Sequence, residues 1–166
     1  MRIAPSFWAF AASPDLKAAQ AAKLSVLDAI GIAEKHANGG KVLEVSFKMQ
    51  GGRPTYFLRT YQNGAVWEGS IDANSGAHLG PGETTPEGDL DDEDKAELAG
   101  LRAASMTLSQ AVSTAEEHAK GKAVSGGLEE TKGGVVWEVI VAANGAAWTV
   151  VIDPRAGRVV SSNAKT

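Results

Sequence analysis

Two stretches of the chain show the same order of hydrophobic and polar positions. Apolar residues recur at helical spacing over residues 26–37 and again over residues 108–119, which predicts two amphipathic helices. After each helix the pattern changes to an alternation of apolar and polar residues, which predicts β-strands. The apolar side of the first strand consists of Leu43, Val45, Phe47 and Met49. The pattern therefore predicts a helix followed by strands, twice.

Helix caps occur at matching places in both stretches. Ser25 and Thr107 each precede a helix and are followed three residues later by Asp or Gln, which is the spacing of an N-terminal capping box. Gly39 and Gly121 follow the last apolar residues of the helices. Both glycines predict left-handed residues that end the helices.

Glycine pairs and Asn-Gly steps divide the rest of each stretch into strands. The glycine pairs at 51–52 and 133–134 predict the first hairpins, and the Asn-Gly steps at 63–64 and 144–145 predict the second. Asn-Gly favours a hairpin because both turn residues need a positive φ. Each copy is therefore expected to be of the α+β class, with one helix packed on a three-stranded antiparallel sheet.

The two copies align with one another along their length. The offset is 82 residues between His36 and His118 and 81 residues between Trp67 and Trp148, with a one-residue gap placed near the first hairpin. Self-similarity with a single gap indicates an internal duplication.

The duplication predicts four parts in the chain. Residues 23–80 and 105–166 form two modules, residues 1–22 an N-terminal tail or signal remnant, and residues 81–104 an acidic linker with a short helix. Because each module has about 60 residues or fewer, its own core is marginal. The modules are therefore expected to bury apolar surface against each other.

These elements resemble the PepSY domain. The capped helix S-x-x-x-A-x-x-x-A-E spans residues 25–34 and the closing strand I-D-x-x-x-G spans residues 71–76, while the second copy has Thr107 as its cap. PepSY proteins are typically periplasmic, secreted or membrane-anchored, and the domain occurs in propeptides of some secreted metallopeptidases. The resemblance implies a periplasmic or secreted protein that binds another protein, such as a secreted peptidase that it inhibits or regulates, without catalysis.

Composition narrows the other classes of function. The chain is 43% hydrophobic and 22% charged, which indicates a folded protein, and no apolar run approaches the roughly 20 residues that span a membrane. The net charge is −4, so a nucleic-acid partner is not expected. Residues 83–97 hold eight acids and one base, which concentrates the acidity in the linker.

The sequence contains no recognisable catalytic motif. It has no Gly-rich phosphate loop after a strand, no Gly-x-Ser-x-Gly and no His-Glu-x-x-His, which are signatures of phosphate binding, serine hydrolysis and zinc hydrolysis. It also has no cysteine, which excludes disulfides, thiolate metal sites and a cysteine nucleophile. We therefore expect no enzymatic activity and no cofactor.

Aromatic and arginine residues of the strands are the candidate protein-binding residues. Tyr56, Arg59, Tyr61 and Trp137 are predicted to lie on an exposed face, since Tyr, Trp and Arg dominate the energetics of protein interfaces. The predicted function is protein binding through the exposed sheet and hairpins.

The acidic linker favours an alternative function, metal-ion binding. Its candidate ligands are Asp89, Asp91, Asp92, Glu93 and Asp94. Clustered carboxylates suit calcium or a trivalent cation. The same residues also suit the first turn of a helix, where the helix dipole favours negative charge, or a solvated linker.

Two pairs of repeated polar residues have a structural and a chemical interpretation. His36 and His118 lie in the last helical turns, where the dipole favours a cation, and a metal or proton-switch role is the alternative. Asp72 and Asp153 open turns and are expected to accept hydrogen bonds from backbone N–H groups. A role as acid or ligand is the alternative for this pair.

Overall fold

The computed structural model describes residues 14–165. Residues 1–13 of the suggested tail or signal remnant lie outside the described residues. The helices are α1 (Pro14–Ala21), α2 (Val26–His36), α3 (Asp92–Ala103) and α4 (Leu108–Ala119), with a 3-10 turn η2 at Glu87–Asp89. The strands are β1 (Lys41–Gln50), β2 (Arg53–Gln62), β3 (Ala65–Asp72), β4 (Glu83–Pro86), β5 (Lys122–Thr131), β6 (Gly134–Ala143), β7 (Ala146–Ile152) and β8 (Val159–Lys165).

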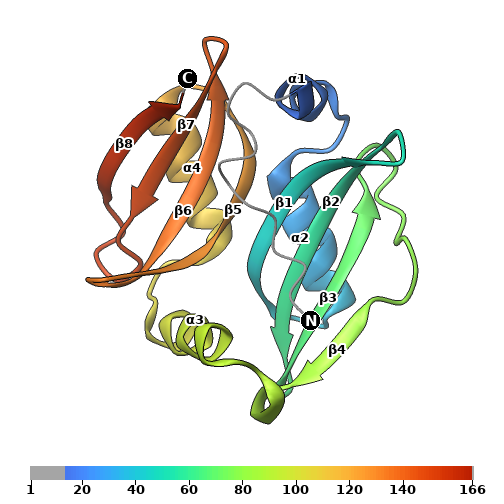
Figure 1. Cartoon of the computed structure of the whole chain (residues 1–166), viewed down its shortest axis with the longest axis vertical. Coiled ribbons are helices and arrows are strands. Elements are labelled where there is room, and N and C mark those ends of the chain that lie inside the picture. Colours follow the sequence, from blue (N-terminus) through green and yellow to red (C-terminus); the bar gives the residue numbers. More distant parts are fainter. Residues whose placement is uncertain (1–13, 166) are drawn as a thin grey trace.

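All strands belong to one eight-stranded antiparallel sheet with the order β4-β3-β2-β1-β5-β6-β7-β8. The two halves meet where β1 pairs with β5, at Glu44–Gly127, Val45–Gly126 and Ser46–Ser125 (Figure 1). The prediction of one three-stranded sheet in each module is therefore not confirmed, because the strands of both modules form a single sheet. Each half contributes a fourth strand, and the pairing of β1 with β5 removes two sheet edges that small separate modules would leave open.

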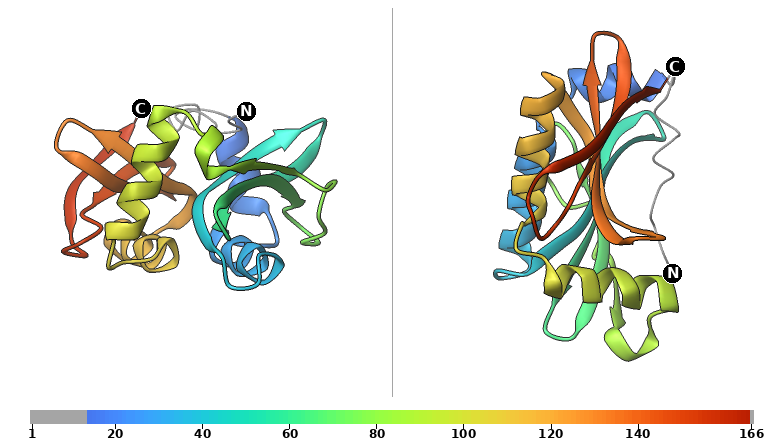
Figure 2. Two further views of the ribbon diagram at one scale, coloured as in Figure 1. Left: turned by 90° about the horizontal axis from the view of Figure 1, so that it is seen from below. Right: turned by 90° about the vertical axis from the view of Figure 1, so that its left-hand side faces the viewer.

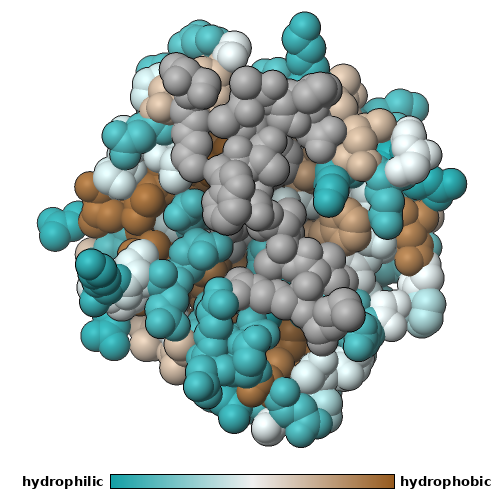
Figure 3. Space-filling view, in the orientation of Figure 1, coloured by the Kyte–Doolittle hydropathy of each residue, from teal (hydrophilic) through white to brown (hydrophobic). Residues whose placement is uncertain are grey.

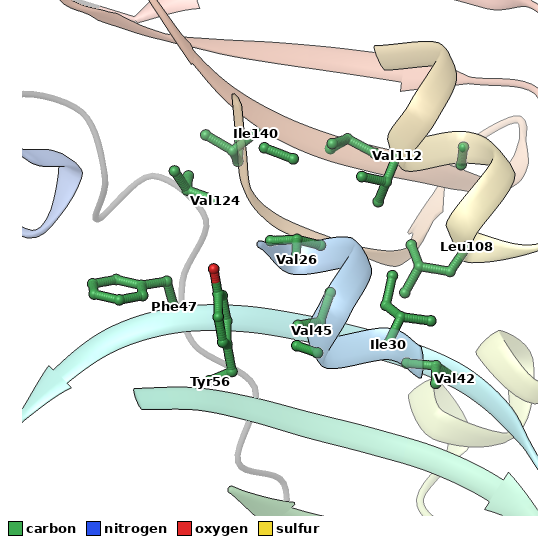
Figure 4. Close-up of a cluster of buried hydrophobic side chains, with 14 of the residues drawn as sticks. Val26, Ile30, Val42, Val45, Phe47, Tyr56, Leu108, Val112, Val124 and Ile140 are labelled. Carbon is green, nitrogen blue, oxygen red and sulfur yellow. The ribbon is translucent and has the colours of Figure 1, made fainter. Parts of the chain in front are cut away.

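The two long amphipathic helices lie on the same face of the sheet. Figure 2 shows α2 and α4 side by side there, while α3 crosses the end of the sheet toward the opposite face. Side chains of α2 and α4, including Val26, Ile30, Leu108 and Val112, meet above Val45 of β1 (Figure 4). The buried apolar residues form one continuous cluster, so the expectation that the two copies bury apolar surface together is confirmed.

Both predicted capping boxes are present. The backbone N–H of Asp28 donates to Ser25 Oγ at 3.0 Å and that of Gln110 to Thr107 Oγ1 at 3.2 Å. The Asp28 and Gln110 side chains each accept the N–H of their cap residue at 2.9 Å. Each helix therefore begins where its local sequence predicts.

The helix ends follow the prediction only in the first copy. Gly39 has a φ of +87°, whereas in the second copy Lys120, with a φ of +56°, takes the left-handed position. Gly121 is needed for another reason, because a Cβ there would collide with the carbonyl oxygen of Ala142. Four residues separate His36 from β1, whereas three separate His118 from β5, so the alignment gap lies in this turn and not near the first hairpin.

The Asn-Gly hairpins lie where they were predicted. Asn63 and Asn144 have φ values of +50° and +52°, and they connect β2 with β3 and β6 with β7. Gly51 and Gly52 likewise have positive φ values between β1 and β2. The hairpin positions thus follow from local turn chemistry.

The tail and the acidic linker contain regular structure. Residues 14–21 form α1, which packs against β1 and β5, and Lys122 Nζ donates to the carbonyl of Ala22 at 3.1 Å. The linker contains β4, η2 and α3, so its expected short helix is confirmed. None of the described helices has the length and apolar character needed to cross a membrane.

Candidate functional site

Three of the four predicted protein-binding residues are buried. Tyr56 and Trp137 are fully buried and Arg59 is 2% exposed, while Tyr61 is half-buried. The expectation that these four side chains form an exposed face is therefore wrong.

Tyr56 and Trp137 hold the two helices onto the sheet. The Tyr56 hydroxyl donates to the carbonyl of Leu24 at 2.8 Å, and Trp137 Nε1 donates to the carbonyl of Met106 at 3.0 Å. Both carbonyls belong to the residue before a helix N-cap. Burial raises the pKa of Tyr56 far above its ordinary value, so its hydroxyl remains a donor. The two rings therefore have the same structural role in the two halves.

Arg59 lies at the centre of a buried charged cluster. Its Nη1 donates to Glu44 Oε1 at 3.2 Å and to Glu97 Oε1 at 3.1 Å, and its Nη2 donates to Asp94 Oδ1 at 2.8 Å. Its Nε lies 3.3 Å from Glu68 Oε1, which is an ion pair without the alignment of a hydrogen bond. We call these five residues the Arg59 cluster.

The Arg59 cluster attaches α3 to the sheet. Glu44, Arg59 and Glu68 are paired across β1, β2 and β3, and the alternation of side chains places them on the face opposite α2. Asp94 and Glu97 reach this face from α3. Because removing one partner from a buried ion pair is strongly destabilising, the Arg59 guanidinium is expected to contribute strongly to holding α3 on the sheet.

The five candidate metal ligands of the linker differ in their contacts and in their exposure. Asp91 caps α3, accepting the N–H of Asp94 at 2.8 Å, and Asp94 also contacts Arg59. Asp89, Asp92 and Glu93 are exposed. In residues 14–165 no group of three or more acidic or histidine side chains is arranged to hold a metal ion. The acidic run therefore matches its alternative interpretation, the negatively charged start of a helix.

The second copy has no equivalent of the charged cluster. The register of β5, β6 and β7 places Ser125, Ile140 and Thr149 where Glu44, Arg59 and Glu68 lie in the first copy. Sequence reasoning compared positions at which the copies agree, and it missed this difference. Three charged residues replaced by uncharged ones at aligned strand positions were the signal that could have revealed the cluster.

Tyr61 takes part in a second contact between α3 and the sheet. Arg102 Nη2 donates to Glu87 Oε1 at 2.6 Å and to the Tyr61 hydroxyl at 3.0 Å, and the guanidinium lies 5.4 Å from the centre of the Tyr61 ring. The hydrogen bond from Arg102 lowers the pKa of Glu87. This contact is largely exposed, so it is energetically weaker than the Arg59 cluster.

The repeated histidines have different surroundings. The ring of His36 lies 4.3 Å from that of His78 and 4.9 Å from that of Trp67, measured between ring centres. Burial, and then the charge of His36, lower the pKa of His78. His118, like His36, is exposed at the end of its helix. Duplication therefore explains the position of the two histidines in the helices but not the ring contacts of His36.

The turn aspartates have the predicted structural role. Asp72 Oδ1 accepts the backbone N–H groups of Asn74 and Ser75 at 2.8 and 2.9 Å, and Asp153 Oδ1 accepts those of the corresponding residues 155 and 156 at 2.8 and 3.1 Å. These hydrogen bonds lower the pKa of both carboxyl groups. The carboxylates therefore stabilise the turns that they open.

A groove with a volume of about 600 Å³ lies beside α3. The wall from α3 consists of the small residues Ala96, Ala99, Gly100 and Ala103. At Gly100 a Cβ would lie 2.6 Å from Val135 Cγ1, so glycine permits the close approach of α3 to β6. We call this depression the α3 groove.

The other wall of the α3 groove comes from the second half of the sheet. It consists of residues 133–136 at the start of β6, residues 153–155 after β7, and Val160 of β8. Val160 is 53% exposed. In the space-filling view, hydrophobic residues gather over the side of the molecule where β7 and β8 lie (Figure 3). The α3 groove thus adjoins an apolar part of the surface, which is a feature of interaction sites.

Comparison with known proteins places the chain in a family. The sequence model of PepSY, the peptidase propeptide and YPEB domain, matches residues 23–80 and 105–163. No curated protein matches the chain. A solved structure of a putative lipoprotein from Clostridium difficile 630 is similar over 86% of this chain and 94% of that chain, with 19% identity and a TM-score of 0.49. Since the two family matches extend over more than half of the chain, the protein belongs to the PepSY family and carries two PepSY domains in tandem.

Proposed function

We propose that this protein is a non-enzymatic, extracytoplasmic binding protein that regulates a peptidase, and that it contacts its partner through the α3 groove. The family description names a peptidase propeptide, and a propeptide acts on its peptidase by contact. The resemblance to PepSY proteins also favours a periplasmic or secreted location. These two arguments come from the family. The contact site that we propose comes from the surface of this chain.

The α3 groove is the observation that carries the proposal. It is lined mostly by small or branched apolar residues and also by the charged residues Asp153 and Arg155. Protein interfaces likewise combine apolar contact surface with polar groups. Small residues in a wall leave room for a large side chain of the partner, which is how anchoring residues fill pockets in tight complexes.

The position of the α3 groove favours regulation by a partner. One wall belongs to α3, which the Arg59 cluster helps to hold on the first half of the sheet, and the other wall belongs to β6, to the turn after β7 and to β8 of the second half. A partner seated there contacts the linker helix α3 and the second half at once. Its binding is therefore sensitive to the placement of α3.

A metal-ion function has less support from the geometry. Within the described residues the acids of the linker have different structural roles, since Asp91 caps α3 and Asp94 contacts Arg59. Protein binding is therefore the single function that we propose.

Affinity capture combined with a peptidase assay tests the proposal. The immobilised full chain is incubated with a periplasmic or secreted fraction of the source cells, and captured peptidases are assayed with and without added protein at micromolar concentration. We expect a captured peptidase whose hydrolysis rate changes when the protein is added. No captured peptidase together with unchanged hydrolysis rates would contradict the proposal.

A matched pair of variants connects the result to the α3 groove. Ala99 lies on the exposed side of α3 and lines the groove, so Ala99→Glu places a charge in it without disturbing the helix, because Glu is a good helix former. Ser113→Glu adds the same charge to the exposed side of α4. We expect the first variant to lose peptidase binding and the second to retain it.

A further inference from the structure

The two edges of the sheet are built differently. One edge is β4, which has four residues and ends with Pro86. Short edge strands that contain proline resist pairing with other chains. The other edge is β8, which has seven residues, Val159–Lys165, with neither proline nor an acidic residue among them. Only the β4 edge therefore has these protective features.

The outer side of β8 is accessible over most of its length. Residues 160, 161, 163 and 164 are exposed, and within residues 14–165 the only strand that pairs with β8 is β7. An edge strand presents a row of backbone N–H and C=O groups that matches another extended chain. Addition of a strand at such an edge is a common mode of peptide recognition.

The charge around β8 is opposite to that of the whole chain. Residues 154–165 contain Arg155, Arg158 and Lys165 and no acid, although the chain has a net charge of −4. Immediately before them, the Asp153 carboxylate is engaged by backbone N–H groups of its own turn. A basic border attracts an acidic segment, and it disfavours pairing of β8 with β8 of a second copy, because like charges would then be brought together.

The α3 groove begins at the first residues of β8. Val160 lies at a register shift between β7 and β8 and also lines the groove beside Pro154 and Arg155. A chain that pairs with β8 therefore passes the opening of the groove. Alternate side chains of an added strand point to one face, so an apolar side chain at the right place can enter the groove.

We propose that β8 is the docking edge for an extended acidic segment of the partner protein, which adds a strand to the sheet and places an apolar side chain in the α3 groove. This inference rests on the proposed function, because it describes how the partner is held. Backbone hydrogen bonds to β8 supply affinity, the groove selects one apolar side chain, and the basic border selects the charge.

Synthetic peptides serve as the probes for this edge. The first probe is a peptide of about eight residues, acetylated at its N-terminus and amidated at its C-terminus. Valine occupies every second position, and threonine and two glutamates occupy the positions between. In the second probe, lysines replace the glutamates. Two further versions of the first peptide carry N-methyl groups on one or the other set of alternate backbone amides. Binding to the full-length protein is followed by amide chemical shifts in NMR spectra.

We expect shift changes at residues 158–165 and around the α3 groove on addition of the acidic peptide. One N-methylated version should bind at least about tenfold more weakly and the other should bind as before, because only alternate amides face the edge and each hydrogen bond contributes about 1 kcal/mol. The lysine peptide should bind more weakly, and added salt should reduce this difference.

Variants at the two edges provide the matched comparison. Val160→Asp places an acid on β8 at an exposed position, and Thr84→Asp does the same on β4. We expect a loss of acidic-peptide binding of at least about tenfold for Val160→Asp, from the removed apolar contact and the added repulsion, and no change for Thr84→Asp. Thermal unfolding of both variants establishes that they are folded.

Four results would overturn the inference. They are an absence of shift changes along β8 at millimolar peptide, equal binding of the two N-methylated peptides, equal weakening by Val160→Asp and Thr84→Asp, and a dimer in sedimentation that protects the β8 amides from exchange without any peptide. The last result would make a second copy the occupant.

Failure of this inference is distinguishable from failure of the proposed function. If a peptidase is captured and its binding is lost in Ala99→Glu but unchanged in Val160→Asp, the α3 groove remains the contact with the peptidase and only the β8 edge is excluded. If no peptidase is captured while the acidic peptide still binds β8, the proposed function fails.

Discussion

Replacing Arg59 by methionine is the sharpest test of how α3 is held on the first half of the sheet. The Arg59 side chain is 3% exposed and lies within 3.3 Å of carboxylate oxygens of Glu44, Glu68, Asp94 and Glu97. Methionine fills a similar volume without charge. The variant therefore leaves four carboxylates gathered in a buried place from which the guanidinium has been removed.

The expected cost follows from the burial of the pair. Removing one partner of a buried ion pair costs about 3–5 kcal/mol. The free energy of unfolding of a domain of this size is about 5–15 kcal/mol. Arg59→Met should therefore remain folded but be clearly destabilised. At about 2–4 °C per kcal/mol for chains of this length, the midpoint of thermal unfolding should fall by about 6–20 °C.

Denaturant unfolding monitored by circular dichroism measures the free energy directly. Amide hydrogen exchange should additionally show faster exchange in α3, since Asp94 and Glu97 bind it to the sheet through Arg59. Adding Glu97→Gln to the Arg59→Met background should restore part of the stability, because one fewer negative charge remains in the cluster.

Arg102→Met provides the matched control. Arg102 also joins α3 to neighbouring groups, but its ion pair with Glu87 has side chains 52% and 34% exposed. We expect a much smaller change for this variant, because solvent screens exposed pairs. If Arg59→Met lowered the free energy of unfolding by less than about 1 kcal/mol, or no more than Arg102→Met, the structural role given to the Arg59 cluster would be refuted.

Three further predictions concern the hydrogen bond of Tyr56 that holds α2 on the sheet, the N-cap of α4, and the contact of His78 with His36. Tyr56→Phe removes the hydrogen bond to the carbonyl of Leu24 and should lower the free energy of unfolding by about 1–3 kcal/mol in denaturant titrations, since a buried acceptor loses its donor. Thr107→Ala removes the cap of α4 and should cost about 0.5–2 kcal/mol in the same assay. Because burial and His36 lower the pKa of His78, the folded protein binds this proton less readily than the unfolded chain, so stability is lost as the pH falls below about 6.5. His78→Gln should flatten the pH dependence of the unfolding midpoint there.

Each of these predictions has a comparison variant. Trp137→Phe removes the equivalent hydrogen bond to Met106 and should be destabilising like Tyr56→Phe. An unchanged free energy of unfolding in either variant would contradict the role of these rings in holding the helices on the sheet. Thr107→Ser should keep the cap, since both hydroxyls accept the same bond. His118→Gln leaves the cluster of His36, Trp67 and His78 intact and should not flatten the pH profile. An identical effect of the two histidine variants would argue against the cluster as the cause.

The local sequence was sufficient to predict the elements of each half. Capping boxes, Asn-Gly steps and the change from helical to alternating periodicity depend on neighbouring residues, so they could be recognised without knowledge of the fold. Because of the duplication, each element was predicted from two matching stretches of sequence. For this reason α2, α4 and the three strands after each helix lie where they were predicted.

The exposure of individual side chains could not be obtained in this way. Tyr56, Arg59 and Trp137 have residue types that suit an interface, but each is buried, because the helices cover one face of the sheet and the Arg59 cluster with α3 covers part of the other. Alternation states which residues share a face and does not state what lies against that face.

The sequence by itself determined the two modules, their caps and their hairpins, and it contained the basic run after Asp153. Only the tertiary structure decided that β1 pairs with β5 to form one sheet, that α3 is held by Arg59, and that β8 is an edge next to the α3 groove. The physical reason is the distance along the chain over which each interaction acts. Caps and turns join residues a few positions apart, whereas Arg59 meets Asp94 and Val45 meets Gly126 only after the whole chain has folded.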